Sequence, residues 1–369
     1  MTIYGIDLGT SNSVIAGDDE VLPCPNGSGA ILPSAVAFMP NGVRKVGKAA
    51  RRRRAIDSDN TVYSSKRIIG RRWDAQETQN FVSRYPFRLV ELDGWPAFET
   101  RAGRVTPTEV GAIILDALCE RGDLPVQTSE VHLTVPASFS TAQRDATEQA
   151  AKLAGLQNVS LIEEPSATAY AYLHADEPFE RAIVYDLGGG TFDCAVLECV
   201  DGEPRITAHA SDLVLGGDDI DHQIAAWVAR YVIEKHNWDL TNYSEVYDRL
   251  LARCEDAKIQ LSDDTEAEIH LSQVDPECPA AEEVVTLTRA LIEDLCQDLV
   301  RRTFIACDSV IRSAGVTPLD IDAVLLAGGA SFMPVIQKGV AAYFGHSGRM
   351  SFDPTEVVAL GASVAHRVG

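Results

Sequence analysis

Asp186-Leu187-Gly188-Gly189-Gly190-Thr191-Phe192-Asp193 lies between two apolar runs, residues 182–185 and 194–197. The pattern of strand, tight glycine turn and strand predicts a β-hairpin. Three successive glycines leave their backbone N–H groups uncovered, so a phosphate group can approach them closely. Asp186 and Asp193 cannot bind phosphate directly. They fit a phosphate ligand if a divalent cation or a water molecule lies between the carboxylates and the phosphate. Alternatively, the two acids only cap the turn.

A second Asp-Leu-Gly turn stands near the start of the chain. Residues 3–7 form a strand-like run, Asp7-Leu8-Gly9-Thr10-Ser11-Asn12 forms a small polar turn, and a β-rich run follows through residues 14–16. Asp7 and Asp186 are separated by about half of the 369 residues. A repeat at that distance predicts two similar lobes, each offering a phosphate-facing hairpin to a shared cleft.

A third glycine turn follows the strand-like run 321–327. Gly328 and Gly329 stand between that run and a helical pattern over residues 333–344. A strand-to-helix corner of this kind is a candidate nucleotide-binding position, because the backbone N–H groups of a helix start face the ligand. A Gly-Gly corner is common, so this signal is weak when it stands alone.

Composition limits the class of protein. The chain has 46% apolar residues, enough for sizeable cores in two or three units, and a net charge of −22. This charge argues against general binding to nucleic acid or to an anionic membrane, and no apolar run is long enough to span a bilayer. The start at Met1 shows no signal peptide, and the eight cysteines are scattered without a Cys-x-x-Cys pair. These features predict a cytoplasmic protein with ordinary thiols, Cys194 and Cys199 among them.

Several further motifs occur in a fixed order and carry a family resemblance. They are Lys66-Arg67-Ile68-Ile69-Gly70-Arg71, Thr134-Val135-Pro136-Ala137, Glu164-Pro165-Ser166-Ala167 and Leu215-Gly216-Gly217-Asp218-Asp219. With the three glycine turns, the sequence resembles the ATPase domain of the DnaK-type heat-shock chaperones, within the actin, sugar-kinase and heat-shock ATPase superfamily. The resemblance runs almost end to end, and the 66–71 and 186–193 strings favour the chaperones over actins and sugar kinases.

The resemblance implies an α/β, two-lobed actin-like ATPase fold, with duplicated ribonuclease H-like cores around a central nucleotide cleft. Residues 1–175 and 352–369 would form the first lobe, with an outer subdomain at about 39–104. Residues 176–351 would form the second lobe, with an outer subdomain at about 216–299.

The resemblance also implies slow, Mg²⁺-dependent hydrolysis of ATP to ADP that drives lobe closure, with K⁺ as a further candidate ion. The implied catalytic residues are Lys66, Glu164, Asp186 and Asp193. The implied magnesium residues, acting mainly through water, are Asp7, Glu164 and Asp186. The implied nucleotide-binding residues are Gly9, Thr10, Ser11, Asn12, Gly188, Gly189, Gly190, Thr191, Gly216, Gly217, Asp218, Glu255, Lys258, Ile259, Ser262, Gly328, Gly329, Ala330 and Phe332.

Each of these assignments has a plainer alternative. Lys66 could be an ordinary surface lysine, and Glu164 could only complement the start of a helix. Glu255 and Lys258 are three residues apart on one helix face, where the family holds the ribose hydroxyls, but that spacing also suits an intrahelical ion pair. For the whole chain, the alternatives are a non-catalytic nucleotide-gated binding module and an actin-like polymerising ATPase.

The chain departs from the family where the adenine base would bind. The family places one arginine directly after the ribose-binding lysine and another shortly after the Gly-Gly corner, and the two sandwich the base. Here Ile259 and Ala330-Ser331-Phe332 occupy those positions. Ile259 and Phe332 could form an apolar, stacking sandwich instead.

Other segments give coarser expectations. Residues 73–103 look irregular, 205–210 look like a strand, and 287–315 and 355–367 look helical. The basic run 44–54 is typical of a solvated helix face, and the more specific alternative is a binding surface for an anionic partner. Glu163 fits no catalytic position and is expected to be structural, and His132 is expected to face along a strand without a metal role.

The resemblance implies candidate partners besides the nucleotide. They are a J-domain cochaperone, a nucleotide-exchange factor or a separate effector domain, with no nucleic acid and no membrane. The sequence ends at Gly369, so we expect no peptide-binding domain or apolar interdomain linker. Pro136 and Arg144 match positions that relay nucleotide state in the family, although Pro136 could simply end its strand and Arg144 could be a solvated helix residue.

Overall fold

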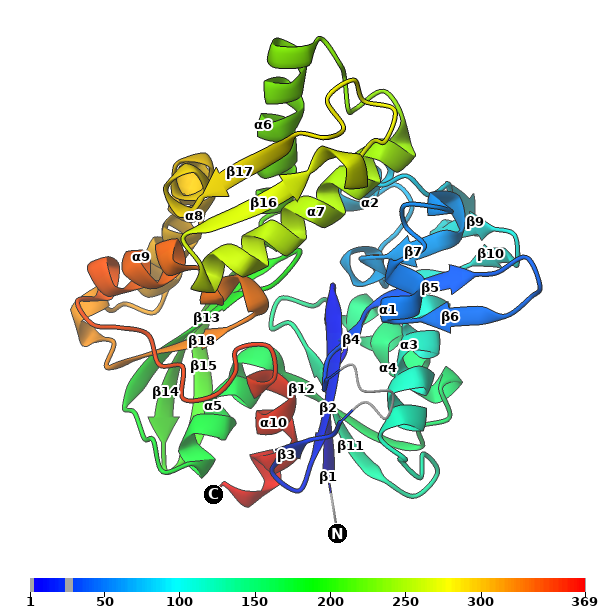
Figure 1. The fold of residues 1–369 in the computed structure, drawn as a ribbon. Coiled ribbons are helices and arrows are strands. Elements are labelled where there is room, and N and C mark those ends of the chain that lie inside the picture. The colour runs from blue at the N-terminus through cyan, green and yellow to red at the C-terminus, as the bar shows by residue number, and fades with distance from the viewer. Residues whose placement is uncertain (1–2, 24–28, 369) are drawn as a thin grey trace.

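A computed structural model describes residues 3–23 and 29–368 (Figure 1). The first predicted hairpin lies in a six-stranded sheet of order β12-β11-β1-β2-β3, in which β4 also pairs with β2. Its strands are β1 (Ile3–Asp7), β2 (Asn12–Gly17), β3 (Glu20–Val21), β4 (Leu32–Pro33), β11 (Glu130–Val135) and β12 (Asn158–Glu163). The apolar run 31–38 contains two short strands, because Ser34 separates β4 from β5 (Ala35–Phe38).

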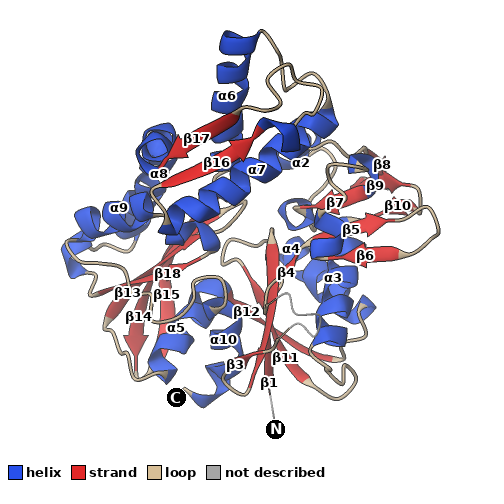
Figure 2. Ribbon diagram, viewed as in Figure 1, coloured by secondary structure: helices blue, strands red, loops and turns tan. Residues whose placement is uncertain are grey.

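The second predicted hairpin lies in a four-stranded sheet of order β15-β14-β13-β18. Its strands are β13 (Arg181–Leu187), β14 (Phe192–Val200), β15 (Glu203–Asp212) and β18 (Ala323–Ala327). In both sheets the central strand pairs antiparallel with the next strand of the chain and parallel with a later one: β1 with β2 and β11, β13 with β14 and β18. The predicted structural repeat is therefore confirmed, and helices and strands form mixed α/β layers (Figure 2).

The residues of β13 alternate between two hydrophobic cores. Ile183 and Tyr185 pack into the core shared with α6 (Gly217–His236), α7 (Ser244–Asp263), α8 (Arg289–Ser313) and α9 (Pro334–Phe344). Ala182 and Val184 pack into a smaller core shared with α5 (Glu164–His174) and α10 (Val357–Val364). Side chains of successive strand residues point to opposite faces, so helices cover both faces of this sheet.

The two sheets meet across the helix pair α5 and α10. Figure 1 shows α10 beside β1 and α5, and α10 packs closely on all three elements. This approach requires small residues: a Cβ on Gly361 would collide with the Ala167 carbonyl, and one on Gly5 would collide with the Ala359 carbonyl. His132 contacts the same helix, with its Nδ1 2.7 Å from the Ala362 carbonyl oxygen. The junction is thus built on backbone contact between elements distant in sequence.

A third core fills the N-terminal half behind its sheet. It is formed with α3 (Pro107–Arg121) and α4 (Thr141–Leu153), and it includes Ile6, Leu115 and Leu133. Helix α3 begins at Thr106 with a capping box, in which Thr106 and Glu109 each accept from the other's backbone N–H group. A proline at the first helical position suits this start because its missing N–H would have no partner there.

Two small sheets and two helices extend the N-terminal core. The sheet β6-β5-β7 contains β6 (Arg44–Val46) and β7 (Thr61–Tyr63), with α1 (Lys48–Arg51) between them in sequence. The expectation that 73–103 is irregular is wrong, because this segment holds α2 (Gln76–Arg84), β8 (Leu89–Leu92), β9 (Trp95–Thr100) and the start of β10 (Gly103–Val105). Stacked and edge-on aromatic side chains, including Phe81, Phe87 and Phe98, stabilise it.

A two-stranded sheet, β16 (Glu266–His270) with β17 (Val284–Thr288), lies beside α7. The long helical stretch expected from residue 287 therefore begins later, at Arg289, because Leu287 and Thr288 belong to β17. The strand expected over 205–210 extends to Glu203–Asp212, and the last expected helix is divided into α10 and a 3₁₀ turn, Ala365–Arg367.

Within residues 3–23 and 29–368, no helix has both the length and the apolar character needed to cross a membrane. The cysteines in these ranges are all unpaired thiols; Cys194 is buried and Cys199 is partly buried. The remaining cysteine, Cys24, lies outside the described residues, as do Met1 and Gly369.

Candidate functional site

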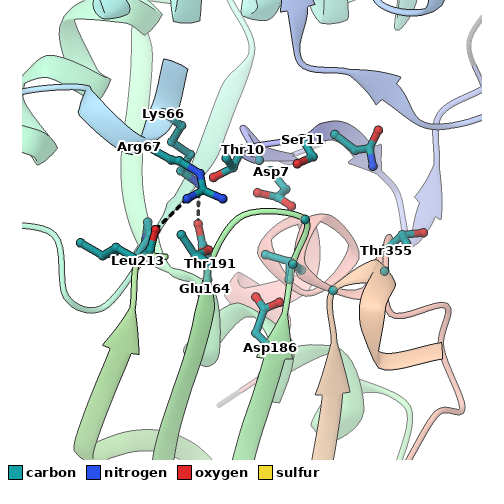
Figure 3. A pocket seen from close by; sticks show the side chains of 18 of the residues that line it. Asp7, Thr10, Ser11, Lys66, Arg67, Glu164, Asp186, Thr191, Leu213 and Thr355 are labelled. Carbon is teal, nitrogen blue, oxygen red and sulfur yellow. Dashed lines mark hydrogen bonds and ion pairs between the residues drawn. The ribbon is translucent and has the colours of Figure 1, made fainter. Parts of the chain in front are cut away.

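A cavity lies where the β1–β2 turn, the β13–β14 turn and the corner after β18 come together (Figure 3). The predicted site residues that line it are Asp7, Gly9, Thr10, Ser11, Asn12, Lys66, Glu164, Asp186, Gly188, Gly189, Thr191, Gly328 and Gly329. They come from both sheets, from the 3₁₀ turn η2 (Ser65–Ile68) and from the start of α5. The fold thus brings all three glycine turns to one place.

The glycines at this site are required by close packing. Gly328 has φ 78°, and a Cβ there would lie 2.5 Å from Asp186 Oδ1. A Cβ on Gly189 would collide with the Ser11 side chain, which belongs to the opposite hairpin. Gly188 and Gly189 accept hydrogen bonds from the backbone N–H groups of Gly217 and Asp218, at 3.0 and 2.6 Å. Gly217 and Asp218 therefore support the glycine turn from behind and do not line the cavity.

Lys66 and Glu164 form an ion pair inside the cavity. Lys66 Nζ donates to Glu164 Oε1 at 2.7 Å, and each side chain is only 10% exposed. Figure 3 shows the two side chains pointing toward one another beside Thr10 and Asp7. The alternative of an ordinary surface lysine is therefore wrong for Lys66. Glu164 also stands in the first turn of α5, so its position at a helix start is compatible with the ion pair.

Three further carboxylates lie close to this ion pair. Asp7 accepts a hydrogen bond from Thr134 Oγ1 at 3.1 Å, and Asp193 accepts one from Ser211 Oγ. Asp186 and Asp193 are direct partners in the antiparallel pairing of β13 with β14, so their side chains share one face. Asp193 does not line the cavity itself and lies behind the glycine turn, 8% exposed.

Burial and mutual repulsion change the charge state of these acids. Burial, followed by repulsion from Glu164, raises the pKa of Asp193 to about 6. Burial raises the pKa of Asp7 to about 6, against the attraction of Lys66. Burial raises the pKa of Asp186 well above its ordinary value, and repulsion from Glu164, Asp193 and Asp7 adds to this effect. Burial alone would lower the pKa of Lys66, but Glu164 and Asp7 raise it above its usual value.

The acids outnumber the one lysine that contacts them, so added positive charge would stabilise the site. Carboxylate oxygens are the ligands that Mg²⁺ prefers, and Mg²⁺ often keeps several of its waters. In the described part of the chain, no group of three or more carboxylate, histidine or cysteine side chains is close enough together to hold an ion directly. The donor set therefore fits a hydrated magnesium ion better than a directly bound one.

Arg67 is a site residue that the sequence motifs did not single out. Its guanidinium lies in the cavity, 9% exposed, and donates to the Leu213 carbonyl at 2.9 Å. Its Nη2 is 3.6 Å from Asp218 Oδ2, and a Cβ on Gly190 would lie 2.6 Å from it. Arg67 thus joins the two halves across the cavity. The signal was its position directly after Lys66, since both residues lie in one short 3₁₀ turn. Cavity residues absent from the predicted set also include Arg71, Phe139, Gln143 and Thr355.

The predicted ribose-binding residues lie beside this cavity and not in its wall. Lys258 Nζ donates to the Gly217 carbonyl at 3.0 Å and to Asp221 Oδ2 at 2.9 Å. Glu255 pairs with Arg51 of the N-terminal half. The intrahelical Glu255–Lys258 ion pair, the alternative above, is therefore wrong, because each residue pairs with another element.

The residues expected to contact the base do not line the cavity either. Ile259 is 58% exposed, Ser262 and Phe332 are partly exposed, and Ala330 is buried. Gly216 supports the glycine turn, since a Cβ there would lie 2.7 Å from the Gly189 carbonyl oxygen. Base recognition by these residues remains a prediction.

The basic segment 44–54 is not a solvated helix face throughout. Besides the Arg51–Glu255 pair, Arg53 lies 3.6 Å from Asp57, and the Arg54 guanidinium stacks 3.8 Å from the centre of the Tyr63 ring. The interpretation as a solvated helix face is therefore wrong for these three arginines. They face acids and rings of the same molecule.

Glu163 at the end of β12 and Arg144 of α4 form an ion pair. Arg144 Nη2 donates to Glu163 Oε1 at 2.8 Å, and Arg144 Nε donates to the Phe139 carbonyl at 3.1 Å. Arg144 is thus not a simple solvated residue, and the structural role expected for Glu163 agrees with this contact. Pro136 ends β11 and lines the cavity.

Comparison with known protein families agrees with this geometry. The family model described as Hsp70 protein matches residues 3–368, almost the whole chain. The two similar α/β halves with their shared cavity are consistent with the two-lobed actin-like ATPase fold that the resemblance implied. Members of the family bind ATP and ADP. This chain belongs to the Hsp70 family, and it corresponds to the ATP-binding domain of those chaperones.

Proposed function

We propose that this chain binds ATP with Mg²⁺, hydrolyses it slowly and couples the nucleotide to closure of its two lobes. One observation carries the proposal. The Lys66–Glu164 pair, at 2.7 Å, lies near the partly buried Asp7 and Asp186 and the buried Asp193, at the point where glycine turns of both halves meet. This is the combination of cation, acids and open backbone that phosphoryl transfer requires.

The phosphates would bind to donors from both halves. Thr10, Ser11 and Asn12 of the first turn face Gly188, Gly189 and Thr191 of the second across the cavity. Ser11 Oγ is buried and has no hydrogen-bond partner among the described residues, so it is available to a phosphate oxygen. Gly190 and Gly216 would keep the second turn in position.

Hydrolysis needs a water molecule in line with the γ-phosphorus. In our proposal Asp193 orients this water and accepts its proton, while an oxygen–phosphorus bond forms and the bond to the ADP oxygen breaks. Lys66 would hold the γ-phosphate and the water through its ammonium group. Asp7, Glu164 and Asp186 would hold magnesium, largely through water; when bound, it would neutralise phosphate charge.

The nucleoside would extend toward α7. We propose that Glu255 and Lys258 reach the ribose after exchanging their present partners, and that Ile259 and Phe332 cover the base. The exposure of Ile259 supports this, because an uncovered aliphatic side chain can gain contact area with a planar base. Ser262 would supply a polar contact to the base.

The lobe division is also a proposal. Separate hydrophobic cores on the two sides of the cavity support lobes at 1–175 with 352–369 and at 176–351. The proposed outer subdomains, about 39–104 and 216–299, contain most strands of the peripheral sheets, although β5 (Ala35–Phe38) and the end of β10 (Gly103–Val105) lie outside the first. A J-domain cochaperone, a nucleotide-exchange factor or a separate effector domain would be a partner of these lobes. K⁺ beside the phosphates and a cytoplasmic location belong to the same proposal.

The decisive experiment is a single-turnover assay of phosphate release from Mg-ATP. The proposal expects slow release by the wild type and much slower release by Lys66→Ala, with ATP still bound. No release above the uncatalysed rate by the wild type would contradict the catalytic part.

A non-catalytic, nucleotide-gated module is the second candidate. The observation that favours it is that the Lys66 ammonium is already occupied by Glu164, and an ion pair of two buried groups must be loosened before it serves a phosphate. Nucleotide binding with lobe movement but without phosphate release would support this candidate. ATP-dependent pelleting would instead reveal a polymerising ATPase.

A further inference from the structure

A second cavity, of about 220 Å³, lies between the peripheral elements of the two halves. The N-terminal half contributes Arg54, Tyr63 and Tyr85, and the C-terminal half contributes Asp248 and Tyr247 of α7. It is smaller than the roughly 300–1,000 Å³ of pockets for drug-sized ligands, so it suits a small molecule. Nothing in the proposed ATP chemistry uses Arg54 or Asp248.

Asp248 carries an acceptor without a partner. The residue is 6% exposed, and its Oδ2 is buried without a hydrogen-bond partner among the described residues. A buried carboxylate oxygen in that state is costly, and burial raises the pKa of Asp248 to about 6 against the attraction of Arg54. A ligand that donates hydrogen bonds to it would relieve this cost.

Arg54 carries a donor without a partner on the other wall. Its Nε is buried without an acceptor among the described residues, and its guanidinium stacks on the Tyr63 ring, 3.8 Å from the ring centre. No ion pair joins Arg54 to Asp248 within the described chain, although both line the same cavity. The cavity thus has a cationic wall and an anionic wall.

The other acids of the cavity have cationic partners. Glu255 pairs with Arg51, Asp221 with Lys258 at 2.8 Å, and Asp218 lies 3.6 Å from Arg67. Arg54 attracts Glu255 and Asp218 as well as Asp248, but no ion pair within the described chain joins it to Asp248, and Tyr63, Tyr85 and Tyr247 line the same cavity. A ligand that matches both Arg54 and Asp248 needs a negative and a positive end and no net charge.

We infer that this cavity binds a small zwitterion of the α-amino acid class. Its carboxylate would accept from the Arg54 guanidinium, and its ammonium would donate to Asp248. The rings of Tyr63, Tyr85 and Tyr247 would contact its side chain, as aromatic rings do with aliphatic, aromatic and cationic groups. Because its two ends contact opposite halves, the ligand would favour the closed arrangement.

The test uses the whole chain without nucleotide. Each common L-amino acid is added alone and thermal unfolding is measured, and the one that stabilises most is then titrated by calorimetry. We expect stabilisation by at least one free amino acid and its loss with the N-acetyl and carboxamide forms, which each lack one charge. Arg54→Gln and Asp248→Asn should each weaken binding about tenfold or more, the range for a charge-assisted hydrogen bond.

Matched variants distinguish a specific loss of amino-acid binding from a general loss of folding. Arg52→Gln and Asp256→Asn make the same changes at exposed positions of the same segments, and they should bind like the wild type. Circular dichroism and unchanged Mg-ADP binding would show that the two test variants are folded. Binding to Lys66→Ala should also be unchanged, so failure of the ATPase proposal would not affect the result. No stabilisation by any amino acid, or equal binding by the blocked forms or by both test variants, would overturn the inference.

Discussion

The ammonium of Lys66 lies 2.7 Å from the carboxylate of Glu164, although 98 positions separate the two residues in the chain. Lys66 comes from a 3₁₀ turn and Glu164 from the first turn of α5. Their contact places one positive charge next to the acids that line the cavity, Asp7, Glu164 and Asp186.

Replacing Lys66 by alanine should leave ATP binding largely intact and lower single-turnover hydrolysis. One well-placed charged group in phosphoryl transfer can change the rate by roughly 10²–10³-fold, about 2.7–4 kcal/mol, by analogy with an oxyanion-hole donor. Rapid mixing with labelled ATP measures the rate. Lys45→Ala, at an exposed position, is the matched control. Equal turnover by wild type and Lys66→Ala would remove Lys66 from the mechanism.

Asp186→Asn should weaken magnesium-dependent nucleotide binding more than metal-free ADP binding. The amide lacks the charge that attracts a hydrated magnesium ion. The substitution also removes the repulsion between Asp186 and Glu164, Asp193 and Asp7, so the free protein should not lose stability through that site. Calorimetry with and without magnesium tests this. A loss of equal size in both conditions would instead indicate a role in folding or in the turn.

Discrimination between adenine and guanine nucleotides should be weaker than in chaperones that have the two arginines. Ile259 and Phe332 offer contact area and stacking, but their side chains have no hydrogen-bond donors. Competition of ATP and GTP for the site gives the preference. A large preference for ATP that persists unchanged in Phe332→Ala would count against this account.

The angle between the lobes should change with the nucleotide. Ser11 and Gly189 belong to opposite hairpins, and a nucleotide that contacts both must favour closure. Small-angle scattering of the apo, ADP and ATP states measures the change. Identical scattering in all three states would refute the coupling.

Hydrolysis should fall below about pH 6 because Asp193, whose pKa is raised to about 6, must be ionised to accept the proton of water. The folding stability of the free protein should change with pH in the opposite direction: it should fall as the pH rises. Since the folded pKa exceeds the ordinary 3.8, the stabilising contribution of Asp193 is complete below about pH 3.8 and is lost as pH rises through 6. The pH profiles of kcat/KM and of unfolding measure both effects.

Asp193→Asn is the comparison for both profiles. Its residual activity should lose the step near pH 6, and its unfolding free energy should depend less on pH over that range. A wild-type kcat/KM profile that is flat from pH 5 to 8 would exclude Asp193 as the group that accepts the proton.

Local sequence determined the two hairpins and the glycine corner. Gly188, Gly189 and Gly190 make a turn possible within a few residues, and the flanking apolar runs pair by local contacts, so this motif can be recognised in one dimension. The repeat starting at Asp7 and the family motifs then predicted the shared cavity and most of its lining. The prediction that residues 73–103 are irregular is wrong, because their short strands are stabilised by an aromatic cluster that forms only on folding.

The tertiary structure alone decided which charges meet. The sequence offered Glu255 and Lys258 as neighbours on one helix face, but folding pairs them with Arg51 and Asp221. Folding also places Arg54 and Asp248 in the walls of one cavity, which no local sequence pattern predicts. Hairpins depend on residues adjacent in the chain, whereas ion pairs and cavities depend on how separately formed elements pack, and burial then sets the strength of each charge.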